Sequence, residues 1–410
     1  MQFRRQVLDN GLEIVAECND RAHSMGLAFF VRTGSRDESP AVAGVSHFLE
    51  HMVFKGTPTR SADDVNRELD EIGSQSNAYT SEEQTVYYAT VLPEYQAQAV
   101  DLLSDILRPS LRTDDFETEK QVIIEEIFKY DDQPPFGAYE KCMAAYFGQH
   151  PLGNNVLGTV ESVGALTPDA MRSYFQHRYS PGNIVLAASG KVDFDALVSS
   201  ADQRCGMWEP FSAPRDLSFS EGQTGYLSIA KEHVSQQYVV QISPGPAADD
   251  PDRYAYRLLT MILGDDSGSR LFWLLVDPGL AEYAVVSCYE FQGTGITMTY
   301  LSCMPEQGAD NLALLAQAQA ELIQDGIAFD ELELAKSKIC SHVVRRGERP
   351  SNRLFSVGNN WLQRGEYHTV RDSVERYRNI TVDDILRVAE RFRVDQTMTV
   401  TVGPNEIQRN

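Results

Sequence analysis

The sequence predicts an α+β protein built from two related domains, each a mainly antiparallel sheet packed with helices. The chain has 410 residues, more than one hydrophobic core usually serves, which indicates two domains of roughly 200 residues each. Strand-like segments often follow one another directly, as at 8–15 and 26–32. This order favours antiparallel sheets over a doubly wound parallel sheet. An internal repeat supports two equivalent halves.

The repeat is a helix, an aromatic residue, a strand and a glycine, found once in each half. In the first half, residues 167–169 open an amphipathic helix, and a strand with a closing glycine follows at 183–190. In the second half, residues 381–383 open a helix, and the strand and glycine follow at 398–403. The two copies lie about half the chain apart, as expected for a duplicated unit.

The predicted domain boundary is the segment 206–225, which gathers Pro, Gly and Ser without clear periodicity. It precedes an apolar, strand-like run at 237–242. The expected domains are therefore 1–205, which contains the candidate metal site described below, and 226–410.

Other elements follow from local pattern. Helices are expected around 114–131 and 309–324, and a strand at 85–91. Residues 1–20 indicate a strand, a turn and a strand rather than the apolar core of a signal peptide. No run of 18 or more apolar residues occurs, so no membrane span is expected and a cytoplasmic location is the simplest interpretation.

The composition is strongly acidic. There are 36 basic and 59 acidic residues, for a net charge of −23. This balance argues against a nucleic-acid partner, because basic side chains supply most of that affinity. Solubility explains the charge most simply, and an acidic surface that prefers basic peptides is the alternative.

The six cysteines are scattered, with no CxxC pair and no Cys/His cluster at metal spacing. They are expected to be buried free thiols in a reducing compartment. They are Cys18, Cys142, Cys205, Cys288, Cys303 and Cys340. A metal in this protein is therefore not expected to have sulfur ligands.

The segment 44–54 predicts a short, buried helix with a metal-binding face. His47 and His51 are four residues apart, so both imidazoles project from one face and can reach the same ion. Glu50 lies on the same side. Buried polar groups need partners, and a metal would satisfy these three. The alternative is two helix histidines with an incidental glutamate.

A catalytic zinc site needs a third protein ligand and an open position for water. The glutamate-rich helix at 114–127 is the best source, because Glu119 and Glu126 are seven residues apart and share a face. The alternative for this helix is a solvated face, and Glu117 and Glu125 are expected to be solvated.

Several blocks resemble the pitrilysin/insulinase family of metallopeptidases, which includes the mitochondrial processing peptidase. Residues 47–57 resemble the family's active-site helix, and residues 76–88 and 119–126 resemble its second and third blocks. Residues 264–272 are similar to the glycine-rich turn and helix of the C-terminal domain. The resemblance spans most of the chain. It implies two related domains facing one another across a cleft.

The resemblance also implies roles for single residues. His47, His51 and Glu126 would bind one Zn2+ per chain, and Glu50 would be the general base. Glu119 would be an accessory acidic residue near the site.

Substrate contacts are implied as well. Asn77 and Ala78 would bind the main chain of the substrate, which can add to a strand edge as a further strand. In the family a tyrosine of the C-terminal half, with an arginine seven residues before it, stabilises the oxyanion, and Tyr283 is the match. Val276 stands where the arginine is expected. The alternative for Tyr283 is a packed strand tyrosine.

The predicted function is a zinc-dependent endopeptidase that hydrolyses extended peptides or unfolded segments with metal-activated water. The main alternative is a non-catalytic or weakly active subunit that binds peptide or supports a peptidase partner. A third is a metal-binding protein without hydrolysis, against which Glu50 argues. In the family four such domains enclose a chamber, so a two-domain chain implies a homodimer or a heterodimer with a related subunit.

Overall fold

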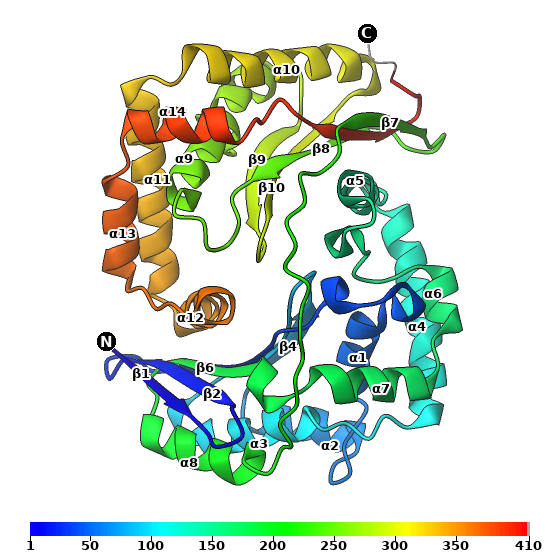
Figure 1. Cartoon of the computed structure of the whole chain (residues 1–410), viewed down its shortest axis with the longest axis vertical. Helices are drawn as coiled ribbons and strands as arrows, with labels where there is room; N and C mark the ends of the chain where they lie inside the picture. The colour runs from blue at the N-terminus through cyan, green and yellow to red at the C-terminus, as the bar shows by residue number, and fades with distance from the viewer. Residues whose placement is uncertain (408–410) are drawn as a thin grey trace. The chain divides into compact units, whose positions relative to one another are not determined.

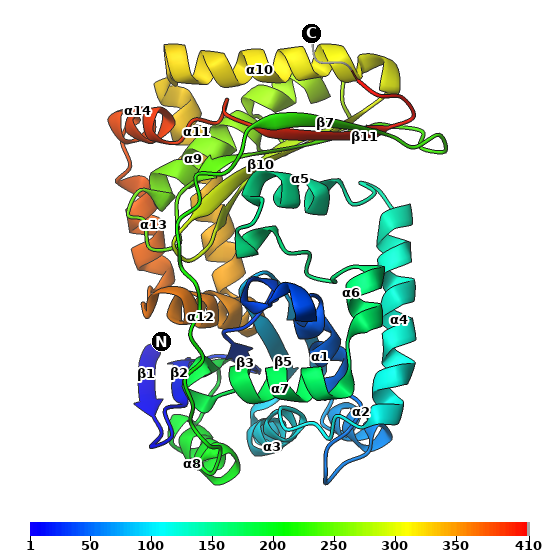
Figure 2. The same cartoon turned by 45° about the vertical axis from the view of Figure 1, so that its right-hand side comes forward.

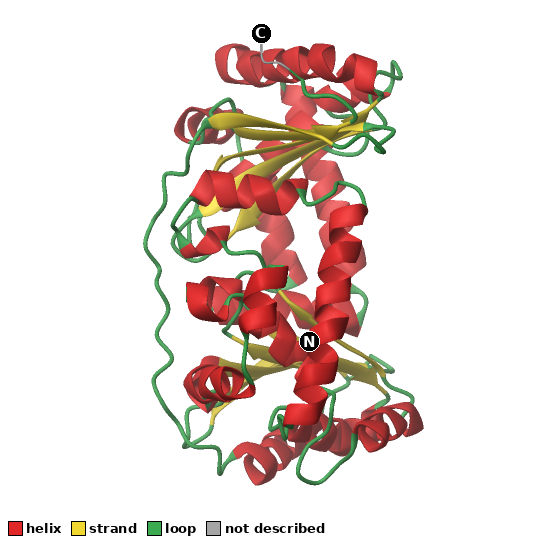
Figure 3. Cartoon of the chain, turned by 90° about the vertical axis from the view of Figure 1, so that its right-hand side faces the viewer, coloured by secondary structure: helices red, strands yellow, loops and turns green. Residues whose placement is uncertain are grey.

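The computed structural model describes residues 1–407 and divides the chain into two compact units (Figure 1). Unit 1 contains Met1–Phe128, Asn154–Asp216 and Arg345–His368. Unit 2 contains Lys129–Gly153, Leu217–Val344 and the chain from Thr369 onward. Each unit is a sheet packed with helices, so the predicted α+β class is confirmed (Figure 3).

Unit 1 contains a six-stranded sheet in the order β1-β2-β6-β3-β5-β4. Only the β2–β6 pair is parallel. The strands are β1 (Gln2–Val7), β2 (Glu13–Cys18), β3 (Met25–Val31), β4 (Gln75–Thr80), β5 (Thr85–Val91) and β6 (Ile184–Gly190). One edge of this sheet is therefore β4.

Unit 2 contains a five-stranded sheet in the order β7-β11-β8-β10-β9. Its strands are β7 (Gly225–Ala230), β8 (Gln237–Gly245), β9 (Tyr283–Glu290), β10 (Gly295–Cys303) and β11 (Met398–Gly403). Only β7–β11 is parallel. The order matches that of unit 1 from β2 to β4, with β6 and β11 in equivalent places. The repeat seen in the sequence is thus a repeat of topology.

The helices of unit 1 cover both faces of its sheet (Figure 2). They are α1 (Val45–Val53), α2 (Ala62–Glu71), α3 (Gln96–Ile106), α4 (Thr113–Asp132), α6 (Val160–Ala165), α7 (Pro168–Arg178), α8 (Phe194–Cys205) and α12 (Pro350–Arg364). Every residue of β3 is buried, because alternate side chains enter two cores. Phe29 packs into the core that holds α1, and Phe30 into the core beneath α12.

Helices also pack on the sheet of unit 2. They are α5 (Ala138–Phe147), α9 (Arg253–Gly264), α10 (Gly308–Asp325), α11 (Phe329–Gly347), α13 (Val370–Arg378) and α14 (Val382–Arg391). The Sγ of Cys142 on α5 lies 3.6 Å from the carbonyl oxygen of Val240 and 3.4 Å from that of Met398. The helix α5 therefore packs directly on β8 and β11.

The two halves of the sequence exchange a helix. The helix α12 comes late in the chain and covers the sheet of unit 1, where Arg353 pairs with the buried Glu17 (2.6 Å). The helix α5 comes early and covers the sheet of unit 2. One crossing between units, Asp216–Leu217, lies within the predicted segment 206–225. The helix exchange was not predicted, because an amphipathic pattern shows that a helix packs but not on which sheet.

Two further features concern the state of the cysteines and the hydropathy of the helices. All six cysteines are free thiols, as predicted, but only four are buried, because Cys18 and Cys288 are partly exposed. None of the helices in residues 1–407 combines the length and the hydropathy needed to cross a membrane.

Candidate metal centre

The helix α1 is held in place by its apolar side. Phe48, Leu49, Met52 and Val53 are buried, and the ring of Phe48 stacks on that of Phe116 from α4, with centroids 4.5 Å apart. This packing fixes α1 against α4. The opposite side of α1 carries the polar residues of the predicted motif.

The start of α1 is fixed by a buried carboxylate. Glu38 accepts hydrogen bonds from the backbone N–H groups of Gly44 and Ser46, both at 2.7 Å. Gly44 has a φ of +91°, a left-handed conformation that favours glycine. Burial raises the pKa of Glu38 to about 8, opposed by these amide hydrogen bonds. Glu38 therefore satisfies two N–H groups that the first turn of a helix leaves without partners.

Glu38→Ala is expected to lower the free energy of unfolding by about 2–3 kcal/mol, because two buried amides lose their acceptor. Denaturant unfolding measures this loss. Glu94→Ala, at an exposed glutamate, is the control and should change stability little. An equal effect in both variants would show that Glu38 does not stabilise the start of α1.

Three side chains converge beside α1 as predicted. The Nε2 atoms of His47 and His51 lie 3.9 Å and 3.6 Å from Oε2 of Glu126 on α4. One ligand atom from each of the three lies within 4.8 Å of the others, and no other such group of three occurs within residues 1–407. The side chains are 12%, 25% and 27% exposed. Solvent can therefore reach the group.

The environment of His47 fits a metal ion. Its Nδ1 is buried without a hydrogen-bond partner among the described residues, and the Glu126 carboxylate is too far from Nε2 for a hydrogen bond. Burial, with the neighbouring His51, lowers the pKa of His47 to about 4. The imidazole is thus neutral near pH 7, with a lone pair available. Two imidazoles and one carboxylate are donors that zinc accepts, with a position left for water.

Glu119 orients His51. Its Oε2 lies 3.2 Å from Nδ1 of His51, and its Oε1 lies 2.5 Å from Nζ of Lys55. An ionised carboxylate only accepts, so Nδ1 of His51 carries the proton and Nε2 keeps its lone pair toward Glu126. Glu117 and Glu125 are exposed as expected, whereas Glu119 is 5% exposed.

Glu119→Ala is expected to weaken zinc binding by roughly 10- to 100-fold, the range for partners that orient metal ligands. Competition with a chelator of known affinity measures this change. Glu125→Ala removes an exposed glutamate from the same helix and should leave the affinity unchanged. Unchanged affinity in Glu119→Ala would remove the orienting role.

Glu50 lies beside this group and contacts the edge strand. Its Oε2 accepts a hydrogen bond of 2.6 Å from Oγ1 of Thr80, at the end of β4. Burial raises the pKa of Glu50, opposed by the hydrogen bond from Thr80 and by His51. Glu50 therefore joins α1 to the edge of the sheet.

Asn77 and Ala78 lie on the free edge of β4. The hydrogen bond from Ser81 N–H to the Gln84 carbonyl sets the phase of the β4–β5 ladder. Two-residue alternation then turns the N–H and C=O of Ala78 away from β5. The outward N–H of Ala78 donates to Oδ1 of the exposed Asn77 (2.9 Å). The C=O of Ala78 thus faces outward and is open to an added strand, while its N–H is held by the Asn77 side chain.

Tyr283 is the first residue of β9, at an edge of the sheet of unit 2. It is 56% exposed, so it is not a packed strand tyrosine. Val276 is the last residue of the short helical segment Phe272–Val276. This segment contains no arginine that could take the place of the family's arginine. Tyr283 belongs to unit 2, whereas His47, His51 and Glu126 belong to unit 1.

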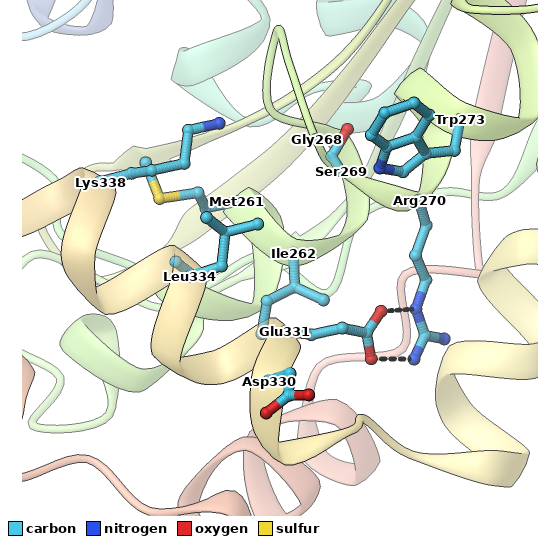
Figure 4. Close-up of a pocket in the computed structure, with 11 residues that line it drawn as sticks. Met261, Ile262, Gly268, Ser269, Arg270, Trp273, Asp330, Glu331, Leu334 and Lys338 are labelled. Atoms are coloured by element: carbon cyan, nitrogen blue, oxygen red, sulfur yellow. Dashed lines mark hydrogen bonds and ion pairs between the residues drawn. The ribbon is translucent and has the colours of Figure 1, made fainter.

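Arg270 is the arginine nearest in the sequence to Val276, but its side chain is hydrogen-bonded to other residues of unit 2. It forms two hydrogen bonds with Glu331 (2.7 and 2.8 Å) in a pocket of about 240 Å³ that Ile262, Trp273 and Leu334 also line (Figure 4). A third hydrogen bond joins it to the carbonyl of Gly326. Its charge is therefore neutralised within this pocket.

Three residues that support the group were not singled out in the sequence: Glu38, Lys55 and Thr80. Alternation along β4 could have placed Thr80 on the same face as Ala78, toward α1. Glu38 and Lys55 leave no comparable local signal.

Comparisons with known proteins agree with this arrangement. Residues 13–160 match the family model described as insulinase (peptidase family M16). Residues 165–339 match the model described as the peptidase M16 inactive domain. All three metal-binding candidates lie within the first match.

Similar sequences cover the whole length. An uncharacterized zinc protease of Mycobacterium bovis is 33% identical over 414 residues, covering 99% of this chain and 94% of the relative. The uncharacterized zinc protease YmxG of Bacillus subtilis is 30% identical over 406 residues, covering 98% of each chain.

A similar fold occurs in solved structures. A protease from Helicobacter pylori superposes with a TM-score of 0.92 at 22% identity, covering 98% of this chain and 100% of that one. A peptidase M16 inactive domain from Pseudomonas fluorescens has a TM-score of 0.91 at 19% identity, covering 100% and 99%.

Proposed function

Because this chain belongs to the insulinase family of peptidases (peptidase family M16), we propose that it is a zinc-dependent endopeptidase for extended peptides or unfolded segments. The convergence of His47, His51 and Glu126 beside Glu50 carries this proposal. The relatives named as zinc proteases support the reaction class.

His47, His51 and Glu126 would hold one zinc ion per chain. The chemistry that zinc supplies when bound is Lewis acidity, which activates water and polarises a carbonyl group. Glu119 and Lys55 keep His51 in the tautomer that ligates through Nε2. The low pKa of His47 keeps its imidazole neutral in mildly acidic solution as well.

Glu50 would act as the general base. Its Oε2 is held by Thr80, and Oε1 has no hydrogen-bond partner among the described residues. Oε1 can therefore take a proton from the attacking water and pass it to the leaving amine. Burial raises the pKa of Glu50, which suits a group that must both accept and release a proton.

The edge of β4 would bind the substrate. An extended peptide can pair with the outward C=O of Ala78 and, by replacing the Asn77 side chain, with its N–H, which leaves the Asn77 amide to contact the peptide backbone. Such pairing reads little sequence and requires an unfolded segment. Tyr283, with its exposed side chain, is our candidate donor to the oxyanion.

We propose that the chain acts as a homodimer or a heterodimer with a related subunit, because the structure divides into two units and the family resemblance implies a chamber of four domains. The six free cysteines support a reducing compartment such as the cytoplasm. A non-catalytic subunit is the second candidate function, favoured by Val276 in the place of the family's arginine.

Digestion of matched substrates tests the substrate class. Zinc-loaded protein is incubated with a mixed peptide library and with a stable folded domain, and products are identified by mass spectrometry. We expect internal cleavage of the peptides, enriched in basic ones if the charge of −23 selects substrate, and no cleavage of the folded domain. Binding of peptides without cleavage would favour the non-catalytic subunit.

A further inference from the structure

Thr80 connects the edge strand to the candidate base. Its Oγ1 lies 2.6 Å from Oε2 of Glu50 and 3.4 Å from Oγ1 of Thr85. The two distances differ enough to distinguish a strong contact from a weak one. The strong contact runs from the strand that carries Asn77 and Ala78 to the helix that carries the metal-binding histidines.

The direction of the hydrogen bonds follows from counting protons. The fully buried Thr85 donates its hydroxyl proton to the carbonyl of Thr33 (3.0 Å). An ionised Glu50 can only accept, and Thr80 has a single hydroxyl proton. Thr80 therefore donates to Oε2 of Glu50 and leaves Oε1 as the carboxylate oxygen open to water.

The position of Thr80 is itself fixed from the other face of the sheet. The preceding residue of β4, Tyr79, packs against Phe355 of α12, with ring centroids 6.2 Å apart. Its hydroxyl accepts a hydrogen bond from Nε2 of Gln84, which also donates to Asn359 of α12. The strand end thus has little freedom to move away from Glu50.

We propose that Thr80 is a positioning residue that holds one oxygen of Glu50 and directs the other toward the substrate water. This rests on the proposed function and adds a residue with no contact to metal. The strand β4 would then have two roles, because the strand proposed to bind substrate would also orient the base.

Thr80→Val removes the hydroxyl at nearly constant shape, and Thr80→Ser keeps it as the matched control. In Thr80→Val, kcat for peptide cleavage is expected to fall by roughly 10- to 100-fold, a part of the roughly 10²- to 10⁴-fold that a general base contributes, with KM, zinc content and thermal unfolding close to wild type. Thr80→Ser is expected to retain most of kcat. A crystal structure of metal-free Thr80→Val is expected to show Glu50 displaced or in two conformers, and that of Thr80→Ser to show it in place.

The outcomes separate this inference from the function on which it rests. If the wild type cleaves peptide and Thr80→Val keeps both its kcat and the position of Glu50, the inference is overturned alone. A rise in KM with lowered thermal stability would assign Thr80 to the structure of β4 and also overturn it. A zinc-loaded wild type that cleaves nothing would overturn the proposed function and this inference together.

Discussion

Glu50→Gln is expected to lower the rate of peptide cleavage by about 10²- to 10⁴-fold, the contribution typical of a general base. The substitution keeps the size of the side chain and lets Thr80 still donate a hydrogen bond to the amide oxygen. It removes the carboxylate that we propose accepts a proton from water. His47, His51 and Glu126 are untouched, so zinc content should remain close to one ion per chain.

The measurement is kcat/KM for one fluorogenic peptide, alongside metal analysis of the same sample. Glu125→Gln, at an exposed glutamate of α4, is the control and should behave as wild type. Full activity in Glu50→Gln would remove Glu50 from the reaction. Loss of zinc in that variant would instead make Glu50 part of the metal-binding group.

His47→Ala is expected to reduce zinc content from close to one ion per chain to near none. Cleavage should then fall by about a thousandfold or more, since Lewis acidity worth several kcal/mol corresponds to that factor at about 1.4 kcal/mol per tenfold. The imidazole it removes is nearly buried, with an unpartnered Nδ1, so no hydrogen bond to protein is lost.

Metal analysis after dialysis and the cleavage rate measure this prediction. His342→Ala removes an exposed histidine of α11 and is the matched control. Both variants should keep the circular dichroism of the wild type. Unchanged zinc content in His47→Ala would contradict the assignment of the site.

The local part of the site could be predicted from sequence because its signals are local. His47 and His51 are one turn apart on a helix, and Glu119 and Glu126 are two turns apart on another. The structure brings His47, His51 and Glu126 together, and Glu119 is hydrogen-bonded to Nδ1 of His51. Their roles as zinc ligands and as an accessory acid stay predictions.

The long-range part could not be predicted in the same way. Thr80 contacts Glu50, which is 30 residues away in the sequence. The helix α12, near the C-terminal end of the sequence, packs on the sheet of unit 1. Such contacts depend on which surfaces meet in three dimensions, and a periodic pattern does not contain this information. Tyr283 shows the same limit, since its exposure is known and its role stays a prediction.

The internal repeat predicted one part of the fold and missed another. The motif at 167–190 and 381–403 predicted two related domains, and the sheets share one strand order from β2 to β4 and from β7 to β9. The exchange of α5 and α12 could not be predicted, because the apolar face of a helix shows that it packs but not on which sheet.

Zinc titration of metal-free protein during cleavage of one unfolded peptide tests the central claim most directly. We predict no cleavage without metal, a rate that rises with added zinc and levels off near one ion per chain, and no rise in Glu50→Gln at equal zinc content. Cleavage that does not depend on zinc, or a fully zinc-loaded wild type that leaves every peptide intact, would contradict the account.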